Sequence, residues 1–285
     1  MILIAEAGST KCDWVLLNDK KEIILHTQTS GLNPAVLHEN ELKTRISGNK
    51  ELKNHFSEKL TLDFYGAACG TSEPKERLER ILNELFPQSK VQIFEDTWAA
   101  VRAVTNTPGI VCILGTGSNS AYFNGKTIEQ PVPSLGYSIM DEAGGFYFGR
   151  ALLRDYFYKK MPKKVAEKFE KEFDLNPNEI KINLYQKPHP NAYVASFASF
   201  IFKEKTEPEA ISYFYRLIKE GIATFIDCRI LSFEKAHEIP VHFVGSVAYF
   251  SKEIITELFE ENNLILGKIV QRPMDGLLTY YASKN

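Results

Sequence analysis

Near its start the chain reads Ile2-Leu3-Ile4-Ala5-Glu6-Ala7-Gly8-Ser9-Thr10-Lys11-Cys12-Asp13-Trp14-Val15-Leu16-Leu17, in which a small polar turn separates two apolar, strand-like runs. About a hundred residues later, Ile110-Val111-Cys112-Ile113-Leu114-Gly115-Thr116-Gly117-Ser118-Asn119-Ser120-Ala121-Tyr122-Phe123 repeats this order. A turn rich in Gly, Ser and Thr offers backbone N–H and hydroxyl donors to a phosphate without obstruction by side chains. Two such turns in one chain predict a pair of loops that hold a polyphosphate from both sides.

The pattern around these turns is that of an α/β protein with a repeated topology. Three strands are followed by helix, strand, helix, strand and helix, and the order restarts at Ile110. We therefore expect two lobes, residues 1–105 and 106–285, each on a five-stranded mixed sheet, with a helical insertion in the second. The strand-like runs are Ile2–Ala7, Asp13–Leu17, Glu22–Gln28, Thr61–Tyr65, Val91–Phe94, Ile110–Leu114, Ser120–Phe123 and Val241–Val244, and the helical patterns are Glu39–Phe56, Glu73–Leu85 and Thr97–Val104.

Composition narrows the class of protein and its partners. The formal net charge of −2 over 285 residues gives no reason to expect a nucleic-acid or membrane partner. No signal peptide is recognisable, and no run approaches the ~18–20 apolar residues of a membrane helix. The four cysteines are scattered and form no C-x-x-C pair, which is typical of reduced thiols. We therefore expect a cytoplasmic protein.

Both turns, with their flanks, resemble the two phosphate motifs of actin-like sugar kinases. Together with further short motifs, in their order and spacing, they resemble the N-acetylglucosamine kinase-like branch of the BadF/BadG/BcrA/BcrD ATPase family. The resemblance extends from Ile2 to Leu278. The further motifs are Ser30-Gly31-Leu32-Asn33-Pro34, Glu95-Asp96-Thr97-Trp98-Ala99-Ala100, Leu135-Gly136-Tyr137, Asp141-Glu142-Ala143-Gly144 and Val244-Gly245-Ser246-Val247.

This resemblance implies a two-lobed actin-like ATPase fold, with duplicated ribonuclease H-like domains and a ligand cleft between them. The segment Met274–Leu278 looks like the family's last helix, which packs back on the first lobe. The implied activity is that of an ATP-dependent sugar kinase. It would transfer the γ-phosphate to a hydroxyl of an amino sugar such as N-acetylglucosamine or glucosamine, with Mg²⁺ as cofactor. A homodimer is the default expectation for the assembly.

Asp96 is the candidate catalytic base. It follows a strand-like run and precedes a helical pattern, which places a carboxylate at the carboxyl edge of a sheet, where α/β sites usually lie. Position alone is equally typical of an ordinary helix N-cap, and the two roles are compatible. The resemblance favours the catalytic role.

The remaining site residues are implied by the resemblance. The phosphates of ATP would contact both turns, although either turn alone is also typical of an ordinary hairpin. Asn33, which could equally be a simple turn residue, would contact the sugar. The full sets are Gly8, Ser9, Thr10, Lys11, Gly115, Thr116, Gly117 and Ser118 for phosphate, Gly245 and Ser246 for adenosine, and Asn33, Gly66, Asp96, Asn119, Gly136 and Asp141 for sugar.

Three positions depart from the family pattern. Glu6 replaces the usual Asp, which holds magnesium through water, and extends the carboxylate by one methylene, roughly 1.5 Å. Met140 and Ala143 replace two glycines around Asp141, so that the local backbone has less freedom. Asp141-Glu142 is also typical of an acidic helix N-terminus, and Gly144-Gly145 would open a helix whose positive end points at the site.

Two alternative functions stay open at this point. One is an ATPase that activates a partner reductase, as BadF-type relatives do through an iron–sulfur cluster shared by a dimer. Such a cluster normally needs four thiolates, and Cys69 is the only loop thiol near the expected site. The other is a catalytically impaired nucleotide- or sugar-binding module, which Glu6 supports best.

Overall fold

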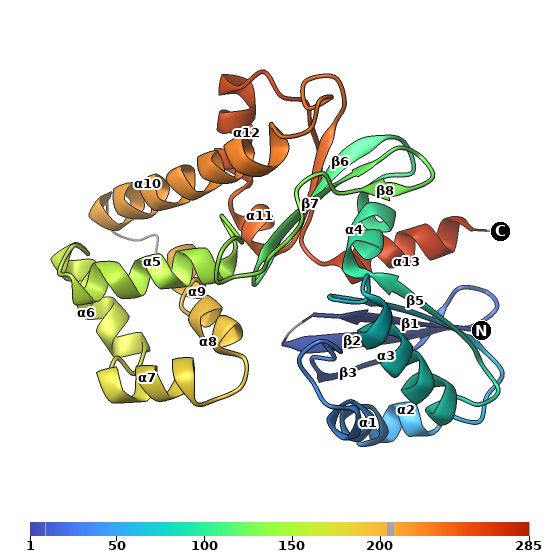
Figure 1. The fold of residues 1–285 in the computed structure, drawn as a ribbon. Helices are drawn as coiled ribbons and strands as arrows, with labels where there is room; N and C mark the ends of the chain where they lie inside the picture. Colours follow the sequence, from blue (N-terminus) through green and yellow to red (C-terminus); the bar gives the residue numbers. More distant parts are fainter. Residues whose placement is uncertain (9, 204–207, 285) are drawn as a thin grey trace. The chain divides into compact units, whose positions relative to one another are not determined.

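The computed structural model describes residues 1–8, 10–203 and 208–284 of the chain. It divides into two compact units (Figure 1), unit 1 with Met1–Ala103 and Pro273–Asn285, and unit 2 with Val104–Arg272. Each unit contains one mixed five-stranded sheet. The α/β class and the repeated sheet are confirmed.

The sheet of unit 1 consists of a meander and two parallel strands. Its strands are β1 (Ile2–Ala7), β2 (Lys11–Leu17), β3 (Ile23–Ser30), β4 (Thr61–Gly66) and β5 (Lys90–Glu95). They lie in the order β3-β2-β1-β4-β5; β2 is antiparallel to β1 and β3, and β4 and β5 run parallel to β1. The first Gly-rich turn connects β1 to β2.

Helices cover both faces of this sheet (Figure 1). They are α1 (Glu39–Ser47), α2 (Lys50–Lys53), α3 (Ser72–Leu85), α4 (Asp96–Val104) and α13 (Pro273–Ser283). The face with Leu3 and Trp14 packs against α1, α2 and α3, and the face with Ile4 and Val15 packs against α4 and α13. Gly276 allows α13 to approach α4, because a Cβ there would lie 2.5 Å from Cα of Ala103.

One predicted helix of unit 1 is two helices. The apolar spacing predicts a single helix over Glu39–Phe56, whereas α1 ends at Ser47 and α2 begins at Lys50. The side-chain oxygen of Asn49 accepts hydrogen bonds from the N–H groups of Glu51 and Leu52, both at 3.0 Å. An Asx cap of this kind starts a new helix, which explains the break.

The sheet of unit 2 repeats the topology of the first. Its strands are β6 (Gly109–Leu114), β7 (Ser118–Phe123), β8 (Ile128–Glu129), β9 (Val241–Val244) and β10 (Leu266–Val270). Read as β8-β7-β6-β9-β10, the sheet has the same antiparallel and parallel neighbours as β3-β2-β1-β4-β5. The second Gly-rich turn connects β6 to β7, as the first connects β1 to β2.

Most helices of unit 2 lie between β8 and β10 in the sequence. They are α5 (Gly145–Phe157), α6 (Lys163–Glu172), α7 (Pro177–Tyr185), α8 (Pro190–Ser196), α9 (Ser199–Lys203), α10 (Pro208–Phe225), η1 (Ile226–Ile230), α11 (Ser246–Phe250) and α12 (Lys252–Glu261). The π-helix η1 continues α10 without a break, and its wider turn is closed by a 2.9 Å hydrogen bond from the Leu231 N–H to the Ile226 carbonyl. Within the described ranges, no helix combines the length and apolar character needed to cross a membrane.

Candidate functional site

Unit 1 gathers carboxylates at one edge of its sheet. Because β1, β4 and β5 are parallel, their carboxyl ends meet at this edge. Glu6 lies one residue before the end of β1 and is paired in register with Asp13 of β2, so that the two side chains share a face of the sheet. Gly66 ends β4, and Asp96 is the first residue of α4, directly after β5. The structure therefore brings Glu6, Gly66 and Asp96 to one edge.

These carboxylates influence one another. Burial, together with the negative charges of Asp13 and Asp96, raises the pKa of Glu6 to about 7, against the opposing charge of Lys11. A group of carboxylates that repel one another gains most from a bound cation, because the cation removes the repulsion. The edge is thus suited to a metal ion and to a carboxylate that accepts a proton.

Asp13 was assigned no role from the sequence, although it lies at the centre of this group. Its Oδ2 is 2.8 Å from Nζ of Lys11, and its Oδ1 accepts a 2.5 Å hydrogen bond from Nε2 of Gln28. Lys11, predicted as a phosphate ligand, is therefore paired with Asp13. The signal in the sequence was a charged residue within the apolar run that follows Lys11 in β2, where Asp13 is 5% exposed.

The first Gly-rich turn is closed by a 2.9 Å hydrogen bond from the Gly8 N–H to the Lys11 carbonyl. Thr10 is exposed, and its carbonyl accepts the N–H of Gly31 at 2.9 Å, which joins the turn to the loop that carries Asn33. Ser9 lies outside the described residues.

The side chain of Asn33 is engaged in a local turn. Its oxygen accepts the N–H of Ala35 at 2.9 Å, as in an Asx turn. Arg45 and Arg77 secure this loop through hydrogen bonds to the carbonyls of Gly31 and Pro34. Asn33 is therefore a turn residue in the structure, and its contact with a sugar stays a prediction.

The second Gly-rich turn, in unit 2, rests on the first residues of α5. The N–H groups of Gly145 and Phe146 donate to the carbonyls of Gly115 and Thr116, both at 2.8 Å. The N-terminal donors of α5 are thus used on the turn itself, so the helix supports the turn and does not present those two donors to a ligand. Ser118 is buried, and its hydroxyl has no hydrogen-bond partner among residues 1–8, 10–203 and 208–284.

Asp141 lies directly against this turn. A Cβ on Gly117 would be 2.3 Å from Oδ2 of Asp141, so only glycine permits the contact. Burial raises the pKa of Asp141, although a hydrogen bond from the backbone N–H of Ser118 opposes the shift. Asp141 and Ala143 have φ of 71° and 55°, a region that favours glycine, which the resemblance implies at the second position.

Gly245 packs beside the same turn. Its φ is 124°, and a Cβ there would lie 2.1 Å from the carbonyl oxygen of Leu114. Ser246 is exposed at the start of α11. Gly136, with φ of 80°, lies in the irregular segment that leads to Asp141. Unit 2 thus brings predicted phosphate, adenosine and sugar residues together.

Arg229, on η1, is a second residue that was missed from the sequence. It is 3% exposed, and its Nη2 donates a 2.8 Å hydrogen bond to Oδ1 of Asn119. The apolar stripe of α10, with Ile218, Ile222 and Phe225, predicts an apolar residue at this position. A charged residue on such a stripe was the available signal.

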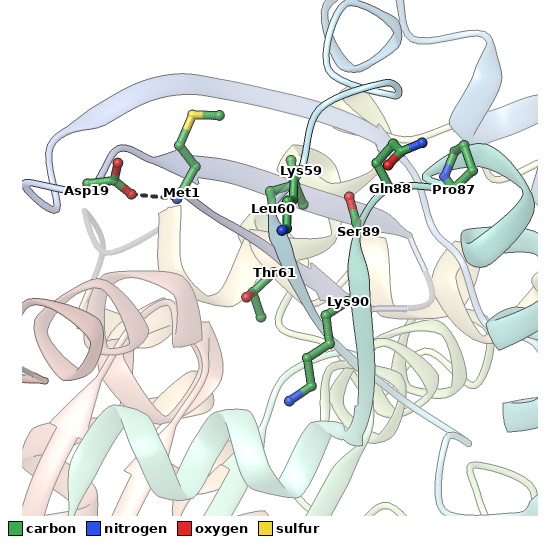
Figure 2. Close-up of a pocket in the computed structure, with 9 residues that line it drawn as sticks. All are labelled: Met1, Asp19, Lys59, Leu60, Thr61, Pro87, Gln88, Ser89 and Lys90. Carbon is green, nitrogen blue, oxygen red and sulfur yellow. Dashed lines mark hydrogen bonds and ion pairs between the residues drawn. The ribbon is translucent and has the colours of Figure 1, made fainter.

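Figure 2 shows a hollow elsewhere in unit 1. It is lined by residues at the starts of β1, β4 and β5, where Met1 pairs with Asp19 at 2.7 Å. Thr61 is paired with Ile2 and Lys90 in the register, which places the hollow at the amino ends of the parallel strands. It is therefore separate from the carboxyl edge with Glu6.

A divalent metal ion at the carboxyl edge would need ligands from a substrate as well as from the protein. Within the described part of the chain, no three His, Cys, Asp or Glu side chains are placed to hold a metal ion by themselves. Mg²⁺ prefers hard oxygen ligands, keeps several waters and is commonly bound by one or two carboxylates plus phosphates. Glu6 and Asp96 fit that mode.

Comparison with known proteins places the chain. No protein-family model and no curated protein matches it. A structure from Porphyromonas gingivalis, provisionally named an N-acetylglucosamine kinase, is 32% identical, with 100% of this chain and 99% of the other covered and a TM-score of 0.88. A Chromobacterium violaceum structure with the same provisional name is 13% identical, with 98% of each chain covered and a TM-score of 0.71.

A ROK family glucokinase from Streptomyces griseus, in complex with glucose and AMPPNP, is 15% identical over 98% of this chain and 97% of its own, with a TM-score of 0.54. The Chromobacterium violaceum and Streptomyces griseus structures share the fold of this chain, with the two mixed sheets of actin-like ATPases. The Porphyromonas gingivalis structure shows the family as well as the fold, because its 32% sequence identity extends over the whole length of both chains. The chain belongs to the same family as the Porphyromonas gingivalis protein, a family of sugar kinases with the actin-like ATPase fold.

Proposed function

We propose that this protein is an ATP-dependent sugar kinase that transfers the γ-phosphoryl group to a hydroxyl of an amino sugar, N-acetylglucosamine or a glucosamine-like sugar. The observation that carries the proposal is the group of carboxylates around Glu6 and Asp96 at the carboxyl edge of unit 1. Phosphoryl transfer needs a divalent cation to neutralise phosphate charge and a group that accepts the proton of the attacking hydroxyl. The family and the amino-sugar name of the relative support this choice.

Asp96 is proposed as the general base that accepts the hydroxyl proton of the sugar. Its position at the start of α4 fixes the carboxylate at the edge of the sheet. Glu6 is proposed to hold Mg²⁺ through water, and the ion supplies charge neutralisation when it is bound. The charge of Asp13, which is held by Lys11 and Gln28, keeps the edge negative and so favours the cation.

The second turn is proposed to bind phosphates of ATP. The buried hydroxyl of Ser118, which is without a partner in the described ranges, and the close-packed Gly117 support this role. Gly8 to Lys11 are proposed to contribute phosphate contacts from unit 1, and Gly245 and Ser246 to contact the adenosine. Asn33, Gly66, Asn119, Gly136 and Asp141 are the proposed sugar contacts.

Placement in the N-acetylglucosamine kinase-like branch of the BadF/BadG/BcrA/BcrD family, and in the cytoplasm, is part of the same proposal. The substrate partners are then small molecules, without nucleic acid or membrane, and the assembly is a homodimer. Size-exclusion chromatography with light scattering measures the last point directly.

The test is a coupled ADP-release assay over a set of hexoses and amino sugars. We expect sugar-dependent ADP release, highest with an amino sugar and absent without Mg²⁺. ADP release that no sugar stimulates would contradict the kinase and leave the ATPase-activator function. A coloured purified protein would point to an iron–sulfur cluster and to that same alternative.

A further inference from the structure

Arg229 is a buried cation held by neutral oxygens. Besides its bond to Asn119, its Nη1 approaches the carbonyl oxygens of Pro133 at 3.3 Å and Val132 at 3.5 Å. No ion pair of Arg229 within 4.0 Å occurs among the described residues. Burying a guanidinium without a paired carboxylate is costly, and a hydrophobic residue would suit the stripe of α10 better. The π-helical turn that carries it is of a kind frequently found at functional sites.

The geometry fixes which way the amide of Asn119 points. Its side-chain atom Oδ1 lies 2.8 Å from Nη2 of Arg229 and 2.9 Å from the backbone nitrogen of Ser120. Both groups can only donate, so the atom between them must be the oxygen of Asn119. The two N–H groups of the amide therefore point away from Arg229.

These N–H groups have no hydrogen-bond partner among residues 1–8, 10–203 and 208–284, and Asn119 is partly exposed. Both acceptor positions of its oxygen are filled. Asn119 can offer a ligand only hydrogen-bond donors, and its counterpart on the ligand must be an acceptor.

Arg229 also connects Asn119 to the segment that leads to Asp141. Its contacts with Val132 and Pro133 lie just before Gly136, and its charge lowers the pKa of Asp141 against the larger effect of burial. The Arg229 guanidinium thereby contacts Asn119 on β7 and the segment with Val132 and Pro133, and its charge acts on Asp141.

We propose that Arg229 is a positioning residue that holds Asn119 as a pure hydrogen-bond donor to an acceptor oxygen of the sugar, a hydroxyl or carbonyl oxygen. The inference rests on the proposed function, since it concerns the sugar site of that kinase. Beyond the proposed function, it states that Asn119 donates the hydrogen bond to the sugar and that Arg229 fixes this direction. Asn119 contacts the sugar, and Arg229 acts through Asn119.

Asn119→Asp is the sharpest variant, because the carboxylate keeps both acceptor bonds, to Arg229 and Ser120, but has no N–H to donate. We expect about a tenfold loss of N-acetylglucosamine affinity by calorimetry and a matching rise in sugar KM, with ATP KM unchanged. Unchanged sugar affinity would overturn the proposal. This variant tests the donor role of Asn119 even if changes at Arg229 prevent folding.

Arg229→Lys and Asn119→Ala then form a double-mutant cycle. Lys keeps the charge but lacks the fork that reaches Asn119 and the two carbonyls. We expect Arg229→Lys to weaken sugar binding in the wild-type background and to have no further effect beside Asn119→Ala. An equal loss in both backgrounds, or an equal loss of ATP affinity, would overturn the positioning role. Arg216→Gln, an exposed change on α10, is the matched control.

The wild-type protein separates this inference from the proposed function. Sugar binding without phosphorylation would refute the kinase and leave the inference standing, provided that the variants behave as expected. Phosphorylation with unaffected variants would refute the inference alone. Absence of any sugar binding by the wild-type protein would overturn both.

Discussion

The two units have the same sheet topology but different chemistry at matching positions. Counting inward from the two Gly-rich turns, the pair Glu6 and Asp13 in unit 1 corresponds to Ile113 and Asn119 in unit 2. The strand β5 is followed by Asp96, whereas β10 is followed by Gln271 and Arg272. The fold is repeated, but the carboxylates that these positions carry in unit 1 have no counterpart at the matching positions of unit 2.

The glycines at these edges are conserved between the copies while the charges are not. Gly66 follows Tyr65 in β4 as Gly245 follows Val244 in β9, and these positions match in the two registers. The comparison teaches that the strand order is repeated at this edge, whereas the backbone conformation of the glycine and the side chains around it differ: φ is positive at Gly245 and not at Gly66. Under the proposed function, cation binding and proton acceptance belong to unit 1, and phosphate binding by the donors of the second turn belongs to unit 2.

Asp96→Asn tests the acidic edge and should have the largest effect. Asn caps a helix about as well as Asp but cannot accept the proton, so kcat should fall about 10²–10⁴-fold with sugar and ATP binding retained. Steady-state kinetics and calorimetry measure both quantities. The exposed change Asp227→Asn in unit 2 is the control, and full activity of Asp96→Asn would remove Asp96 as the base.

Gly117→Ala tests the donor-rich edge of unit 2. The new Cβ would lie 2.3 Å from Oδ2 of Asp141, so the turn or the carboxylate must move. We expect ATP KM to rise about 10- to 100-fold, since a misplaced phosphate contact loses binding. Gly115→Ala, whose Cβ would meet nothing within 4 Å, should have a smaller effect. The reverse order of the two variants would contradict this view of the turn.

The sequence was most informative where the pattern was local. Both strand–turn–strand stretches, Asp96 at the start of a helix and the repeated order of elements follow from apolar runs and Gly-rich turns. Strands β8 and β10 were not predicted, because two residues in one and mixed exposure in the other leave no clear alternation. The partners of Asp13 and Arg229 lie on other elements, so only the tertiary structure shows what these charges do.

The two sheets also differ at a buried position: β9 carries His242 where β4 carries Asp63 in the matching register. Burial and the charge of Lys268 lower the pKa of His242 to about 4. Between this value and the usual pKa near 6.5, the unfolded chain binds more protons, so stability should fall as the pH drops through this window, by about 1–3 kcal/mol.

Urea unfolding of the wild-type protein and His242→Gln at pH 7.5 and pH 5 measures this difference. The wild-type protein should lose more stability on acidification than the variant. Equal losses in the two proteins would mean that His242 does not titrate in this way.

Glu6→Asp should have the smallest effect and refines the acidic edge. The shorter carboxylate is the one that the sequence resemblance implies at this position, and a better distance to hydrated Mg²⁺ should lower the magnesium needed for half-maximal rate, by up to about tenfold. Magnesium titrations of activity provide the measurement, with the exposed change Glu79→Asp as control. A higher magnesium requirement in Glu6→Asp would show that the site is adapted to Glu.

The most direct test of the account is the product itself. Wild-type protein, ATP, Mg²⁺ and N-acetylglucosamine or glucosamine are incubated, and ADP and phosphorylated sugar are quantified by phosphorus NMR and mass spectrometry. The account predicts one sugar phosphate for each ADP, and both products formed about 10²–10⁴-fold more slowly with Asp96→Asn. ADP formed without a phosphorylated sugar, or undiminished product with Asp96→Asn, would contradict it.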